Sequence, residues 1–170
     1  MHVVAQPLTK DEALARWAEL CRDNSVAELE ARFEMDEYGE LRMTPPPSLR
    51  HQLIADALAA QMREQLGGRA VVECPVYAGK VYVADIAWIP EDAPTENLDT
   101  AIVAPPLVVE VRSPGNTSAG IAAKVAAYLA HGVREIALTE LDASVSYVTN
   151  EGRAATSALG VTLLVPEGLA

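Results

Sequence analysis

Two runs of apolar residues, 81–89 and 107–112, each contain one acidic residue, Asp85 in the first and Glu110 in the second. The first run, VYVADIAWI, is apolar at both odd and even positions, which is typical of a central strand covered on both faces. The second, LVVEVR, has the same character. A charge inside such a strand is costly unless it is paired or bound to a metal. The sequence therefore predicts a covered sheet into which two carboxylates point.

The rest of the chain supplies further strands and the helices that would cover this sheet. Apolar residues at helical spacing predict helices over 9–24, where Thr9 and Glu12 form a capping box, over 48–66 and over 117–131. Further strands are expected over 32–35, 40–43, 70–76, 134–141, 145–149 and 160–165, and a long acidic loop over 90–106. This order favours an α/β (α+β) fold with a central mixed β-sheet flanked by helices. We expect one domain over 1–170, with the 9–24 helix as an N-terminal extension.

The composition favours a cytoplasmic protein. No apolar run approaches the ~20 residues of a membrane span, and the N-terminus lacks the basic start and apolar stretch of a signal peptide. Cys21 and Cys74 fit neither a metal-ligand spacing nor a disulfide framework. A G-x-S-x-G elbow and a phosphate-binding G-x-x-x-x-G-K-[ST] loop are absent from the sequence, which argues against a serine hydrolase and a nucleotide-driven machine.

The formal charge of −11 is unfavourable for a nucleic-acid-binding protein, which usually presents a basic surface to phosphates. The charge is uneven along the chain. Residues 1–40 hold ten acids against four bases, and residues 81–100 hold five acids and no base. Residues 41–80 hold five bases against three acids. The middle of the chain is therefore mildly basic, but no strongly basic segment stands out.

Asp85 and Glu110 would repel each other if the two strands brought them close. A divalent cation such as Mg²⁺ (or Mn²⁺) relieves that repulsion and suits hard oxygen ligands. Lys124 lies at the edge of the apolar stripe of the 117–131 helix, from which its ammonium can reach the two acids while its stem covers the core. It would there orient a water and offset charge on a phosphate. A purely structural ion pair between Lys124 and one acid is the alternative.

Four segments carry a resemblance to a known family. They are FEMDEYGELRMTPPPSLRH (33–51), VADIAWIP (83–90), PPLVVEVRSP (105–114) and KVAAYLAHGVREIAL (124–138). In order and spacing, they resemble the Uma-two family, whose members are similar in fold to the PD-(D/E)xK restriction endonucleases. The resemblance implies a restriction-endonuclease-like core and Mg²⁺-dependent (or Mn²⁺-dependent) hydrolysis of nucleic-acid phosphodiester bonds, with DNA favoured over RNA.

The resemblance also implies roles for individual residues. The catalytic set would be Asp85, Glu110 and Lys124, and the metal ligands would be Asp85, Glu110 and Glu34. Supporting roles would fall to His51, Arg112 and Tyr128. From the residues alone, Glu34 and His51 are equally compatible with plain surface positions. Strand alternation places Tyr82 and Trp88 on the face away from Asp85, as core or partner surface.

The sequence departs from the family pattern at three places. Ala84 precedes Asp85 where proline is expected, Arg112 replaces the lysine of the D/E-x-K motif, and REIALTE lacks the expected aromatic residue. Arg112 cannot readily release a proton, although it can grip a phosphate. These departures leave open a catalytically decayed copy of the nuclease fold that acts as a binding or interaction module. The exposed apolar content is compatible with a homodimer.

Overall fold

The computed structural model describes residues 6–28, 31–94 and 99–169. The helices are α1 (Lys10–Arg22), α2 (Asn24–Ala27), α3 (Leu49–Leu66) and α4 (Ser118–Ala130). The strands are β1 (Arg32–Met35), β2 (Leu41–Thr44), β3 (Arg69–Tyr77), β4 (Val81–Ile89), β5 (Ile102–Val103), β6 (Leu107–Val111), β7 (Glu135–Thr139), β8 (Val145–Thr149) and β9 (Gly152–Ala154).

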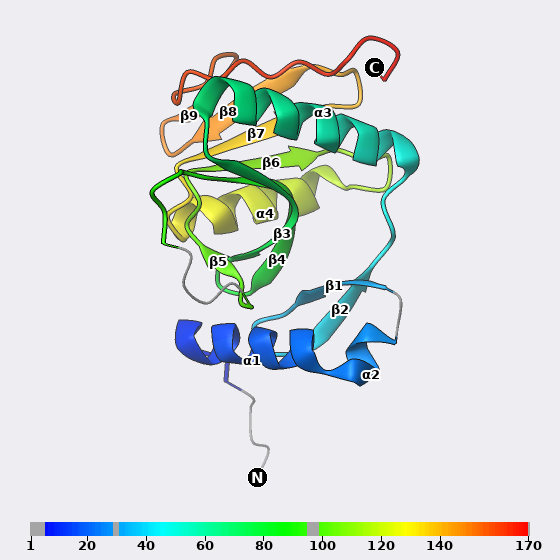
Figure 1. Ribbon diagram of the computed structural model, residues 1–170, viewed down its shortest axis with the longest axis vertical. Helices are drawn as coiled ribbons and strands as arrows, with labels where there is room; N and C mark the ends of the chain where they lie inside the picture. The colour runs from blue at the N-terminus through cyan, green and yellow to red at the C-terminus, as the bar shows by residue number, and fades with distance from the viewer. Residues whose placement is uncertain (1–5, 29–30, 95–98, 170) are drawn as a thin grey trace.

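The strands form one mixed sheet in the order β2-β1-β4-β6-β7-β8-β9, with β3 along the other edge of β4 and β5 beside β3. The β6–β7 and β3–β5 pairs are parallel, and the other pairs are antiparallel. Helices flank the sheet (Figure 1). The predicted mixed α/β fold with a central mixed sheet is therefore confirmed.

The sheet forks along one edge of β4. On this edge β1 pairs with β4 only at Val81, while β6 begins to pair at Ile86. The opposite edge is taken up by β3 over the whole length of β4. Among the described residues, no strand therefore covers 82–85 on the forked edge, and the backbone there is open to side chains. Asp85 lies in this stretch.

Three hydrophobic clusters hold the helices against the sheet. One joins α3 to β6 through residues such as Leu58 and Val109, and a second joins α4 to β7 through Tyr128 and Ile136. In Figure 1, α3 and α4 lie on opposite sides of β6 and β7. The third cluster packs Trp17 of α1 against β1 and the first half of β4.

β3 and β4 exchange faces at the position of Asp85. The register pairs Val72 with Ile86 and Cys74 with Ala84, and Glu73 between them has a left-handed φ of 51°. On one side of this point Val72 and Ile86 pack in the α3 cluster, while on the other Cys74 and Ala84 pack in the α4 cluster.

The exchange of faces corrects one prediction from simple alternation. Trp88 packs against the α3 cluster, whereas Tyr82 packs against the α4 cluster. The two aromatic side chains therefore do not share a face. Tyr82 lies close to the predicted catalytic lysine, because Lys124 Nζ is 5.6 Å from its ring centroid.

The strand expected over 160–165 is wrong, although its alternation is real. Val161 and Leu163 are buried and Thr162 and Leu164 are exposed, as in a strand, but the segment joins no sheet. It runs beside α3 (Figure 1). The side chain of Gln65 donates to and accepts from the backbone of Thr162, and Gln61 does the same with Leu164, all at 2.8 Å. The segment thus takes its hydrogen bonds from helix side chains in place of a neighbouring strand.

Other boundaries differ in detail. The capping box of Thr9 and Glu12 is present, but the 9–24 helix ends at Arg22, where Asp23 caps the short α2. The 90–106 loop contains β5, whose pairing with β3 was not predicted, and residues 95–98 of the loop lie outside the described residues. The 134–141 strand is shorter, as β7, and β9 was not predicted. Among the described helices, none is long and apolar enough to cross a bilayer.

Candidate active site

Asp85 is held in the fork by groups from three elements. Its Oδ2 accepts a 2.7 Å hydrogen bond from the backbone amide of Val111 in β6 and lies 3.2 Å from His51 Nε2 at the start of α3. Its Oδ1 accepts from Arg32 of β1 at 3.3 Å. The carboxylate is 5 % exposed, so these three contacts fix both of its oxygens in a buried position.

Glu110 points into the same region from β6 and meets α4. Lys124 Nζ donates to Glu110 Oε2 at 2.9 Å, and the Tyr128 hydroxyl donates to Oε1 at 2.9 Å. Lys124 and Tyr128 are four residues apart in α4, so both lie on one face of the helix. Glu110 is also 5 % exposed. The lysine–glutamate contact that the sequence predicted as an option is therefore a direct ion pair.

Glu34 completes the cluster from β1. Its Oε1 lies 3.5 Å from Lys124 Nζ and accepts a 3.3 Å hydrogen bond from the backbone amide of Val83. The carbonyl of Val83 accepts from Arg32 at 3.0 Å and from Lys124 at 3.2 Å. The backbone amide and carbonyl of Val83 thus form their hydrogen bonds with side chains of the site, where a neighbouring strand would otherwise supply the partners.

The two buried carboxylates have opposite electrostatic environments. Burial and the charge of Asp85 raise the pKa of Glu110 to about 7, against the opposing effect of Lys124. Burial also acts on Asp85, but the hydrogen bond and charge of His51, with Lys124 and the Val111 amide, lower the pKa of that carboxyl. Environments that shift the pKa values of two neighbouring carboxyl groups in opposite directions are typical of sites in which the two groups have different chemical roles.

The basic and phenolic groups keep their protons. Burial disfavours the ammonium of Lys124, yet the carboxylates of Glu110, Glu34 and Asp85 hold its pKa above the usual value. Burial and the neighbouring Glu110 raise the pKa of the Tyr128 phenol well above its ordinary value. The cluster therefore presents a charged lysine and a neutral phenol to Glu110 at neutral pH.

Of the residues singled out in the sequence, Glu34, His51, Asp85, Glu110, Lys124 and Tyr128 come together in the fork. Arg112 does not join them. Its guanidinium bonds Glu140 at 2.7 Å and Ser118 at 2.8 Å, beyond the end of β6. Sequence reasoning missed Arg32, which contacts Asp85, because a lone arginine at the start of a short strand gives no signal of where it points.

Among the residues that the structure describes, two further buried acids lie outside this cluster. Glu135, at the start of β7, accepts hydrogen bonds from Ser157, Ala158 and Leu159 and fixes the turn over 157–159. Asp36 accepts from the backbone of the β1–β2 turn and from Arg42. A buried acid in this fold is therefore not by itself a sign of chemistry. What distinguishes Asp85 and Glu110 is that they share a lysine-containing cluster.

The carboxylate oxygens of the cluster suit a hard cation that keeps much of its hydration shell. Within the described residues, no group of three or more His, Cys, Asp or Glu side chains forms a ready cage. Mg²⁺, however, is commonly held by one or two carboxylates plus waters and substrate phosphates. Glu110 accepts two hydrogen bonds, which leaves lone pairs free. Burial and the charge of Asp85, which raise the pKa of Glu110 to about 7, disfavour the negative charge of Glu110, and a bound cation would offset that cost. Asp85 and Glu110 therefore fit such an ion.

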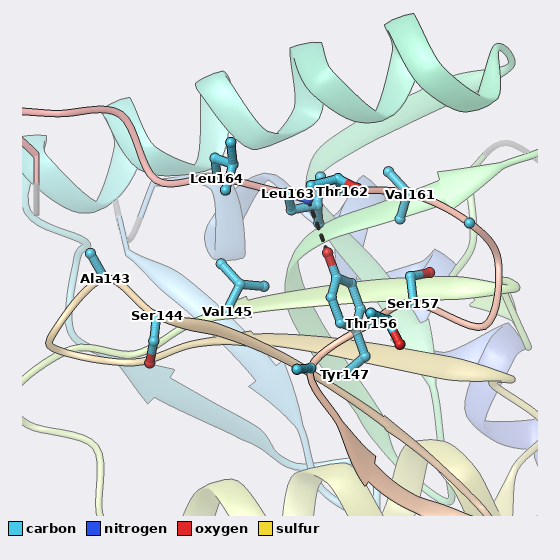
Figure 2. Close-up of a pocket in the computed structure, with 12 residues that line it drawn as sticks. Ala143, Ser144, Val145, Tyr147, Thr156, Ser157, Val161, Thr162, Leu163 and Leu164 are labelled. Atoms are coloured by element: carbon cyan, nitrogen blue, oxygen red, sulfur yellow. Dashed lines mark hydrogen bonds between the residues drawn. The ribbon is translucent and has the colours of Figure 1, made fainter.

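Among the described residues, two clefts of similar volume can be compared. One, of about 390 Å³, lies between β8 and the 160–164 segment, and Figure 2 shows Tyr147 crossing to bond the backbone of Leu163. None of the described residues that line it is charged. The other, of about 420 Å³, includes in its lining His51 and Val111, both of which contact Asp85.

Fold and site together define a nuclease-like α/β protein, in which a mixed sheet forks around buried carboxylates and a lysine. A protein described as "a putative nuclease belonging to DUF820", from Anabaena variabilis ATCC 29413, has a similar crystal structure, with a TM-score of 0.62 and 20 % identity. The similarity covers 74 % of this chain and 76 % of that one. Residues 16–169 match the Uma2 (Uma-two) family, described as "Putative restriction endonuclease", and the chain belongs to this family. No curated protein matches significantly.

Proposed function

We propose that the chain is a divalent-metal-dependent nuclease that hydrolyses phosphodiester bonds in the fork between β1, β4 and β6. One observation carries the proposal: the buried carboxylates of Asp85 and Glu110 converge with Lys124, whose Nζ lies 2.9 Å from Glu110. Family membership supports the same activity. DNA is the favoured substrate, and Mg²⁺ or Mn²⁺ the favoured ion.

Asp85 and Glu110 would hold the ion, with Glu34, whose Oε1 lies 3.5 Å from Lys124 Nζ, as a further carboxylate. When bound, such an ion polarises a phosphoryl oxygen and lowers the pKa of a water. The raised pKa of Glu110 adds a consequence, because its proton must leave before the carboxylate binds a cation. Metal binding is then expected to release protons near neutral pH.

The chain's own residues supply orientation and charge. Lys124 keeps its proton, so it acts as a positive donor to a phosphate or a water and not as a base. Tyr128 fixes the Oε1 side of Glu110, which leaves Oε2 toward Lys124. His51 and Arg32 hold the carboxylate of Asp85 from two sides. Each group is positioned by a packed element, as a preorganised site requires.

A binding module of the same fold is the second candidate. The formal charge of −11 favours it, since a nucleic-acid enzyme usually carries a basic surface. The ion pairs around Asp85 and Glu110 also satisfy these acids without any metal. On this alternative, the cluster would be purely structural and no cleavage would occur.

Cleavage of labelled single-stranded and duplex DNA and RNA, with Mg²⁺, Mn²⁺ or chelator, tests the proposal. We expect metal-dependent cleavage that falls by at least about a hundredfold in Asp85→Asn, Glu110→Gln and Lys124→Gln, in line with the loss of charge-stabilising groups at active sites. Glu135→Gln is the matched control, because it neutralises a buried acid of the same sheet outside the cluster. Folded Glu135→Gln protein should keep its activity per molecule. Equal activity in all four variants would overturn the proposal.

A further inference from the structure

The cleft of about 420 Å³ next to His51 and Val111 has cationic residues of its own, outside the catalytic cluster. Its lining includes Arg50 and His51 from the first turn of α3, Arg112 and Ser113 after β6, and Glu140 after β7. The first turn of an 18-residue helix also contributes positive partial charge to this space. In a chain of net charge −11, this local excess of cations is unusual.

The two arginines are held in place by groups outside the catalytic cluster. Arg50 Nε donates to the carbonyl of Leu169 at 2.8 Å, so the C-terminal segment fixes the Nε end of this guanidinium. Arg112 is fixed by Glu140 and Ser118. Its Nε is buried and lacks a partner among the described residues. Each guanidinium retains N–H groups beyond those in use, because an arginine carries five donors.

His51 joins the cleft to the catalytic cluster. The residue is 8 % exposed, its Nε2 contacts Asp85, and it lines the cleft. The Val111 backbone lies near the ring, yet within the described residues no atom meets hydrogen-bond geometry at the buried Nδ1. A buried polar nitrogen without a partner is costly, which indicates that a ligand or water completes it.

The shape of the cleft restricts what can enter. A volume of about 420 Å³ lies toward the small end of ligand pockets. The apolar part of the lining, including Ile54, Pro114 and Leu141, suits a base or sugar, while the cations suit a phosphate. A base reaches such a recess only after it leaves the helical stack, which costs a few kcal/mol in a duplex and little in a single strand.

We propose that this cleft is a subsite for one unpaired nucleotide, whose phosphate is held by Arg112 and Arg50 next to the cleavage position. It follows that the chain acts on single-stranded, frayed or flapped nucleic acid in preference to intact duplex. This inference rests on the proposed nuclease function for its biological meaning. The subsite itself can be measured without any cleavage.

The test is calorimetric titration of the full chain with thymidine 5′-monophosphate in chelator, with thymidine as the probe that lacks phosphate. We expect binding of the monophosphate but not of thymidine, weakened about tenfold in Arg112→Gln, as for loss of a charged hydrogen bond. Glu140→Gln should strengthen binding, because it removes the carboxylate that neutralises Arg112. Arg134→Gln is the control. This exposed arginine lies just before the start of β7, at the opposite end of the strand from Glu140, and its loss changes the net charge by the same amount.

The outcomes separate the subsite from the nuclease function. Equal binding of thymidine and its monophosphate, or binding insensitive to Arg112→Gln and Glu140→Gln, would overturn the subsite even if the protein cleaves DNA. Monophosphate binding with the expected variant pattern, in a protein that cleaves nothing, would support the subsite and reject the nuclease. In an active protein, Arg112→Gln should raise KM for single strands severalfold with kcat little changed. Faster cleavage of blunt duplex than of single strands would refute the preference for unpaired nucleotides.

Discussion

At the scale of single residues, neighbouring groups explain why two equally buried acids in the fork differ in pKa. Asp85 and Glu110 are equally exposed, at 5 %. Yet the pKa of Asp85 is lowered despite its burial, through His51, Lys124 and the Val111 amide, whereas burial and the charge of Asp85 raise that of Glu110 to about 7. The molecule thus holds one permanent negative charge beside one that a proton or a cation can compensate.

Removal of the lysine should damage stability as well as any activity. Lys124→Met leaves Glu110, Glu34 and the carbonyl of Val83 without their shared donor. We expect a loss of about 3 kcal/mol in the free energy of unfolding, as for breaking a buried ion pair on one side. Urea denaturation measures it. Addition of Glu110→Gln should recover part of the loss, because the remaining partner is then neutral. A cost near zero for Lys124→Met would mean that the pair is not formed.

The residues that could be predicted from the sequence are those whose type conflicts with their surroundings. Asp85 and Glu110 interrupt apolar strands, and Lys124 borders an apolar helix stripe, so each stands out by itself. Arg32 and Tyr82 do not. Their position near the site depends on the fork and on the exchange of faces at Glu73, and neither feature has a sequence pattern of its own.

At the scale of elements, the C-terminal segment shows how a helix can replace a strand as a partner. A helix rises ~1.5 Å and a strand ~3.3 Å per residue, so four helical residues match about two extended ones. Gln65 and Gln61 therefore meet Thr162 and Leu164 in sequence, each through two hydrogen bonds. The alternation over 160–165 predicts an extended segment correctly, but nothing in alternation reveals whether its partner is a strand or a row of amides.

This arrangement predicts a specific loss of protection. Gln61→Ala or Gln65→Ala should each lower the free energy of unfolding by about 1–2 kcal/mol, since each removes two hydrogen bonds. Hydrogen exchange should accelerate at the amide of Leu164 or Thr162 respectively. Gln52→Ala is the control on the same helix, because its side chain has a single hydrogen bond within the described residues, to the exposed Glu73 side chain. If exchange over 160–165 is unchanged in both variants, the amide pairing is not what holds the segment.

The end of β7 should contribute to stability in a pH-dependent way. The hydrogen bond from Arg112 lowers the pKa of Glu140 below its ordinary 4.5, with help from Arg153. A lowered folded-state pKa means that the stabilisation is present above pH 4.5 and is lost as pH falls through the folded value. Glu140→Gln should therefore cost about 0.5–1 kcal/mol at neutral pH, the range of partly exposed pairs. In thermal melts from pH 7 to pH 3, the difference in stability between wild type and Glu140→Gln should shrink. A difference that grows on acidification would contradict the lowered pKa of Glu140.

At the scale of the whole molecule, the charge distribution predicts how any nucleic acid would bind. The formal charge of −11 opposes a broad contact with phosphates, and cations near the fork and its cleft are few. Arg32 is paired with the buried Asp85, so we count Lys124, Arg50 and Arg112 as the phosphate contacts. With about 0.7 counterions released per phosphate on a single strand, three contacts give a log–log salt slope near −2. Fluorescence anisotropy with a single-stranded oligonucleotide and a catalytically inactive variant measures it. A slope steeper than about −5 would reveal a basic surface that the described residues do not display.

The overall architecture was predictable because its signals are long and local. The runs over 81–89 and 107–112, the capped helices and the turns between them set the order of elements, and this order favours a mixed sheet. The fork was not predictable, because it depends on where β1 stops pairing and β6 starts, which is set by packing between segments distant in sequence.

The way the fork is closed bears on how relatives of this protein should be compared. The buried amide and carbonyl of Val83 depend on Glu34, Arg32 and Lys124 for their hydrogen bonds. Since a buried backbone group without a partner costs about 1–3 kcal/mol, a descendant that had lost all catalysis would still be selected to keep these side chains. Retention of the Glu34, Arg32 and Lys124 set across a lineage therefore reports first on folding. Only its loss together with a compensating strand pairing at Val83 would mark where the chemistry had been abandoned.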